Sequence, residues 1–63
     1  MNYIEGLVNL IEELINGKEL AVNFSHLRGE LSAVYAMGFV SREEYGKLHG
    51  ELLMLERKAN EAD

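Results

Sequence analysis

The sequence contains no cysteine and no proline, and few of its residues are basic. Without cysteine the chain has no disulfide and no thiolate metal site. Only 6 lysines and arginines stand against 11 acidic residues, and the net charge of -5 disfavours binding to nucleic acid or to an anionic membrane. No apolar run approaches the ~20 residues that span a bilayer, and the first residues, which include Glu5, do not read as a secretion signal. We therefore expect a protein of the cytoplasm.

The shortness of the chain limits how it can be stabilised. Its 63 residues allow one domain, residues 1–63, and 48% of them are hydrophobic, which is enough for a core. A chain of this size buries only roughly 60% of its unfolded surface, and small folds usually need a disulfide, a metal or a partner subunit. With no disulfide available, helix packing and association between copies are the expected stabilisers.

Residues 38–45 carry the clearest local signals in the chain. Gly38 can adopt the left-handed backbone conformation that closes a helix. Ser41 can cap the next helix, and Glu44 stands three residues later, where the partner in a capping box belongs. Val40 and Tyr45 occupy the two positions of a hydrophobic staple. The segment predicts a tight corner between two helices and offers no catalytic chemistry.

Helical periodicity predicts three helices, over about residues 2–16, 23–37 and 42–60. Gly17 should end the first, and Asn23 should cap the second after an irregular connector. The apolar face of the first comprises Ile4, Leu7, Val8, Ile11, Leu14 and Ile15, widened by Tyr3 and Leu10. That of the second comprises Phe24, Leu27, Leu31, Val34 and Tyr35, and that of the third Tyr45, Leu48, Leu52, Leu55 and Ala59.

The predicted fold class is all-α. We expect a small three-helix bundle, or a helical hairpin with an amphipathic N-terminal helix, completed by oligomerisation. Its buried residues should include Ile4, Ile11, Leu27, Leu31, Leu48 and Leu52.

A second stripe runs along the third predicted helix, away from its apolar face. It consists of Gly46, Gly50, Leu53, Met54 and Arg57. Each glycine costs a helix roughly 1 kcal/mol relative to alanine, but small residues let another backbone approach closely, and methionine suits an adaptable contact. The stripe predicts a protein interface. In the alternative interpretation the helix is rotated, so that the glycines face a neighbouring helix of the same chain or the solvent.

Catalytic and metal-binding groups do not converge in the sequence. His26 and Glu30 lie one helical turn apart, but two ligands do not make a site, and His49 fits the edge of a core. The glutamate pairs at 12–13 and 43–44 are neighbours on helices, so they point about 100° apart and form poor acid–base dyads. We expect no enzymatic activity, no cofactor and no bound metal.

Residues 31–48, LSAVYAMGFVSREEYGKL, carry a recognisable pattern. It resembles the helix–Gly–hydrophobic–Ser/Thr-x-x-Glu–aromatic hairpin of SHOCT-type short bacterial domains, which are associated with oligomerisation and protein contact. The resemblance covers about a third of the chain and departs from the family pattern at Gly46 and Gly50, where lysine-rich sequence usually follows. Short acidic helical proteins are also common products of bacteriophages and mobile elements.

Three functions remain open from the sequence. The leading one is a non-enzymatic helical module that binds protein, itself above all, as a homodimer. The second is a phage or mobile-element inhibitor that presents Glu5, Glu12 and Glu13 to a basic, nucleic-acid-binding surface of a host protein. The third, and least favoured, is a helix-turn-helix DNA binder, because its recognition helix would be acidic.

Overall fold

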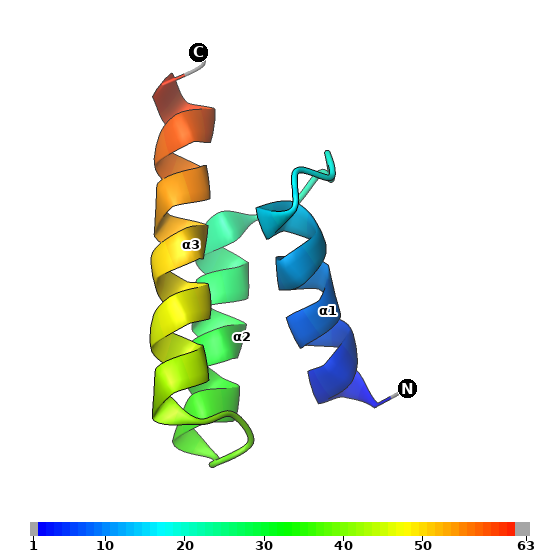
Figure 1. The fold of residues 1–63 in the computed structure, drawn as a ribbon, viewed down its shortest axis with the longest axis vertical. Helices are drawn as coiled ribbons and strands as arrows, with labels where there is room; N and C mark the ends of the chain where they lie inside the picture. Colours follow the sequence, from blue (N-terminus) through cyan, green and yellow to red (C-terminus); the bar gives the residue numbers. More distant parts are fainter. Residues whose placement is uncertain (1, 62–63) are drawn as a thin grey trace.

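The computed structural model describes residues 2–61, and in that range it contains three helices and no strand. The helices are α1 (Tyr3–Ile15), α2 (Phe24–Ala36) and α3 (Arg42–Glu61). Helices α2 and α3 form an antiparallel hairpin, α1 stands beside it, and α3 extends past both at its C-terminal end (Figure 1). Both shorter helices pack on α3. The structure confirms the all-α prediction, with helix bounds within one residue of those expected.

Each helix begins with a side chain that satisfies a free backbone N–H of the first turn. The Asn2 side chain accepts from the Glu5 N–H at 2.8 Å. The Asn23 side chain accepts from the His26 N–H at 2.9 Å, and the Ser41 hydroxyl accepts from the Glu44 N–H at 3.0 Å. Asn23 therefore starts α2 as predicted, and the connector before it is not helical. Leu20 and Val22 of this connector nevertheless pack against the core.

Helices α1 and α2 end in the same way, each with a glycine in the left-handed region. The φ angles are 97° at Gly17 and 84° at Gly38. At the end of α2 the Gly38 N–H donates to the Tyr35 carbonyl and the Phe39 N–H donates to the Val34 carbonyl, both at 2.9 Å. This pair of bonds is the Schellman motif, which satisfies carbonyls that the helix leaves free. The predicted corner is confirmed at both of its ends.

Removing the cap of α3 should weaken the fold measurably. In Ser41→Ala the Glu44 N–H loses its acceptor, so we expect the free energy of unfolding to fall by about 1 kcal/mol. Urea denaturation followed by circular dichroism measures the change. Ser41→Asp keeps an acceptor at the same position and is the matched control. Equal stabilities of the two variants would mean that the hydroxyl does not cap α3 in solution.

The core lies where the three helices meet. Its buried side chains are Leu7, Ile11, Leu14, Leu27, Leu31, Val34, Val40, Leu48 and Leu52. Of the six residues predicted to be buried, only Ile4 is half-buried rather than buried. The core is thus built from one face of each helix, together with Val40 from the corner.

Two residues assigned to inward faces are exposed. Tyr3 is the first residue of α1, where its ring lies largely in solvent and its hydroxyl donates to the Glu30 carboxylate of α2. Ala59 is exposed because α3 is 20 residues long and α1 and α2 only 13, so the last turns of α3 extend past both of these helices. Helical spacing identifies a face, but it does not say how far along the helix a neighbour covers it.

Polar and aromatic contacts fix the register of the α2–α3 hairpin. The Tyr35 and Tyr45 rings stack with centroids 4.3 Å apart, and the Tyr45 hydroxyl shares a hydrogen bond of 3.1 Å with Ser32. Nearer the other end, Arg28 pairs with Glu56 at 2.9 Å. Late residues of α2 thus contact early residues of α3, and an early residue of α2 contacts a late residue of α3, as an antiparallel pair requires. They hold the outer side of α3 in one orientation.

Candidate protein interface

The stripe predicted on α3 lies on the surface of the protein. All five residues are exposed, and we call them the α3 outer face: Gly46, Gly50, Leu53, Met54 and Arg57. Two of them are large apolar side chains, Leu53 with 39% and Met54 with 57% of its area exposed. The face lies opposite the core residues Leu48 and Leu52, as helical geometry requires. The structure thus brings all the predicted interface residues together on one side of one helix.

The two glycines of this face have no neighbour from another element among residues 2–61. Apart from the neighbouring backbone of α3 itself, a Cβ atom built at Gly46 or at Gly50 would have no atom within 4 Å. This excludes the alternative in which they face a neighbouring helix of the same chain, and leaves them facing solvent. Each costs α3 roughly 1 kcal/mol relative to alanine, and no packing within the chain offsets that cost. Within a single copy the glycines therefore have no structural purpose that we can identify.

A charged residue lies near each end of the face. Arg57 is seven residues after Gly50, and Glu43 is seven residues before it. Seven residues are close to two helical turns, so both side chains lie on the same side as Gly50. Both are exposed, and neither forms an ion pair within residues 2–61. Sequence reasoning missed Glu43 as part of this surface, although its spacing from Gly50 could have identified it.

A second apolar surface lies at the α2–α3 corner and was not predicted. Met37 and Phe39 are each more than half exposed. Phe39 and Val40 line a groove of about 350 Å³ against the first half of α1. The other residues of the groove are Ile4, Glu5, Val8, Asn9 and Glu44. Phe39 follows a helix end and belongs to no helical face, so periodicity could not assign it.

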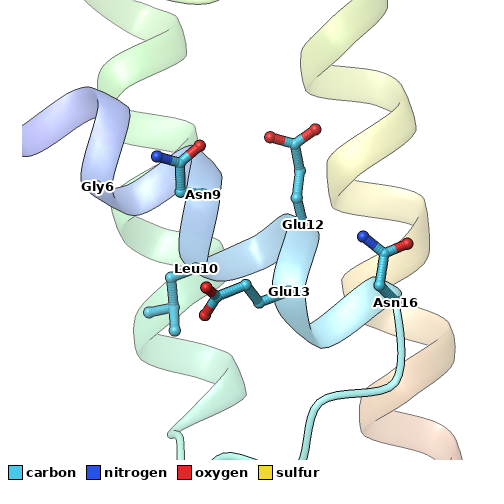
Figure 2. A pocket seen from close by; sticks show the side chains of 6 residues that line it. All are labelled: Gly6, Asn9, Leu10, Glu12, Glu13 and Asn16. Atoms are coloured by element: carbon cyan, nitrogen blue, oxygen red, sulfur yellow. The ribbon is translucent and has the colours of Figure 1, made fainter.

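The acidic side of α1 carries polar side chains that line a depression (Figure 2). This depression, of about 530 Å³, is lined by Gly6, Asn9, Leu10, Glu12, Glu13 and Asn16. The Glu12 and Glu13 side chains point in different directions, which does not bring their carboxylates together (Figure 2). Glu13 also pairs with Lys18 at 3.5 Å. The arrangement offers separate charges on a helix surface.

His26 and Glu30 do lie together, as their spacing predicts, with 3.1 Å between His26 Nε2 and Glu30 Oε1. The Glu30 carboxylate is also the acceptor for Tyr3, so it joins α1 to α2. His49 is half-buried, with its ring centroid 5.2 Å from that of Tyr45. Between residues 2 and 61 no three His, Cys, Asp or Glu side chains are grouped so that they could hold a metal ion. In the same range no helix has the length and apolarity needed to cross a membrane.

Comparisons of the chain with protein-family models, with curated proteins and with solved structures found no match. The resemblance of residues 31–48 to SHOCT-type hairpins therefore rests on their sequence pattern alone.

Proposed function

We propose that this chain is a small acidic helical interaction module of the cytoplasm, without enzymatic activity, that associates with a second copy of itself through the α3 outer face. One observation carries the proposal. The longest helix exposes Leu53 and Met54 beside two glycines that no other described element contacts. Small residues permit close helix approach, and methionine provides an adaptable apolar contact. A partner helix on this face would bury the apolar groups and make use of the glycines.

The modest size of the core supports association. In the described part of the chain nine buried side chains hold the three helices together, and the sequence has no cysteine to form a disulfide. Folds of this length are marginally stable, and a bound partner stabilises the folded state by mass action. A second copy would also cover part of α3, whose C-terminal turns extend past the other helices (Figure 1).

Met54→Glu should shift the protein from dimer toward monomer. A glutamate there would place a charge in an apolar contact, so we expect the dissociation constant to rise at least about tenfold. Sedimentation equilibrium over a range of protein concentrations measures this, and the melting temperature of the wild type should rise with concentration. Met37→Glu is the matched control, because Met37 is 62% exposed and lies at the corner rather than on the α3 outer face.

A wild type that stays monomeric at concentrations on the order of hundreds of micromolar would rule out self-association as a function. If Met37→Glu and Met54→Glu raised the dissociation constant of the dimer equally, the interface would not lie on the α3 outer face. Gly50→Leu gives a second check, because leucine should block close approach of a partner while favouring the helix by roughly 1 kcal/mol. That variant should therefore be a more stable monomer and a poorer dimer.

The other two functions have less support. For an inhibitor of a basic surface, α1 presents Glu5 and Glu12 without an ion pair in the described range, but Glu13 is already paired with Lys18. For a helix-turn-helix DNA binder, the α2–α3 pair has the wrong geometry. Its helices run antiparallel, whereas the two helices of that motif cross at roughly 90–120°. The first turn of α3 also carries Glu43 and Glu44, which would repel phosphates.

A further inference from the structure

We infer that the two copies meet with their α3 helices antiparallel and with the twofold axis close to Gly50, so that Arg57 of each copy pairs with Glu43 of the other. The inference rests on the proposed self-association and specifies its geometry. It starts from charge. Glu43 and Arg57 lie on one side of α3, at equal distances in sequence from Gly50, and both lack an ion-pair partner within residues 2–61.

Twofold symmetry turns this spacing into pairs of facing residues. In an antiparallel pair centred on one residue, a side chain a given number of positions after the centre faces the side chain the same number before it. At 1.5 Å per residue, Arg57 and Glu43 each lie roughly 10 Å from Gly50 along the helix. Arg57 of one copy then lies opposite the partner's Glu43, and the same pair forms again at the other end. Each interface would hold two oppositely charged pairs.

The same arrangement matches side chains by size. Met54, four residues after Gly50, faces the partner's Gly46, where a large flexible side chain meets open space. Gly50 lies near Gly50 of the partner subunit, where two backbones come closest. The charged positions and the Met54 position of the face thus meet complementary ones.

A parallel pair would not achieve this. It would place Glu43 against Glu43 and Arg57 against Arg57, and like charges across an interface are unfavourable. It would also bring the two Met54 side chains together and the two Gly46 positions together, which leaves one end crowded and the other open. Charge and size both select the antiparallel arrangement.

The test is a charge exchange. Glu43→Arg and Arg57→Glu should each raise the dissociation constant of the dimer about tenfold, because each variant places two like-charged pairs across the interface. The double variant restores opposite charges and should dimerise within about threefold of the wild type. Sedimentation equilibrium measures all four proteins. Glu44→Arg is the matched control, since it alters the charge of the same first turn of α3 but lies off the α3 outer face.

Engineered cysteines test the direction independently, because the chain has no native cysteine. Glu43→Cys and Arg57→Cys proteins, mixed in equal amounts and oxidised, should give almost only the mixed disulfide dimer. A predominance of disulfides that join two Glu43→Cys chains to each other would show a parallel pair and overturn the inference. So would single charge variants that dimerise like the wild type, or a double variant that is not restored. If the geometry failed in one of these ways but the wild type still dimerised and Met54→Glu weakened that dimer, the proposed function would stand. A monomeric wild type would contradict both the proposed function and this geometry.

Discussion

Leu31→Ala is expected to remove a large part of the stability of the fold. Leu31 has no exposed area and lies at the centre of the core with Ile11 and Leu52. Removing a buried leucine side chain costs about 2–5 kcal/mol through lost burial and the cavity left behind. A chain of 63 residues has a total stability of roughly 3–9 kcal/mol. The loss is therefore comparable with the whole free energy of unfolding.

Urea denaturation followed by helical circular dichroism measures this loss, with Met37→Ala as the matched control. Met37 is mostly exposed at the end of α2, so its truncation should change the free energy of unfolding by no more than about 0.5 kcal/mol. If Leu31→Ala lowered the stability by less than about 1 kcal/mol, the helices would have to pack differently in solution.

Gly38→Val should produce the second large loss, by a backbone mechanism. Gly38 has a φ of 84°, and a Cβ atom there would meet no neighbour, so the penalty comes from conformation alone. The left-handed region costs an ordinary residue about 1–2 kcal/mol, and a β-branched residue is worse. We expect a loss of at least about 2 kcal/mol, measured by the same urea denaturation.

Gly29→Val is the matched control for this change. Gly29 also has open space around it, but it lies within α2 with ordinary helical geometry. Valine is a better helix former than glycine, so this variant should be unchanged or slightly more stable. A Gly38→Val protein as stable as the Gly29→Val protein would mean that α2 does not end at Gly38 in solution.

The corner and the helix bounds could be predicted because several local signals agree there. Gly38 ends one helix and Ser41 caps the next, and each effect acts through backbone bonds within a few residues. The face of α2 that contains Leu27, Leu31 and Val34 was likewise readable, because helical spacing alone decides which residues lie on one side. Local chemistry therefore determined these features, and no knowledge of the tertiary arrangement was needed.

The features that the sequence left hidden depend on contacts between distant segments. Nothing local shows that α1 packs on α3, that Tyr3 reaches across to Glu30, or that the turns around Ala59 extend past the other helices. The groove beside Phe39 exists only because α1 passes the corner. The glycines of the α3 outer face were predicted from the sequence. The pairing of Glu43 with Arg57 could be inferred only from the structure, because it depends on both residues lacking an ion pair in the described range.

The order of contacts along the chain also has a consequence for how the protein folds. Helices α2 and α3 are joined by the short corner, so their pairing closes a small loop at little entropic cost. The residues of α1 and α3 that contact each other are separated in the sequence by the whole of α2. This contact is more favourable once α2 and α3 have already paired. We therefore expect the hairpin to form first and α1 to dock late. Changes in the corner should then act mainly on the folding rate, and changes in α1 mainly on the rate of unfolding.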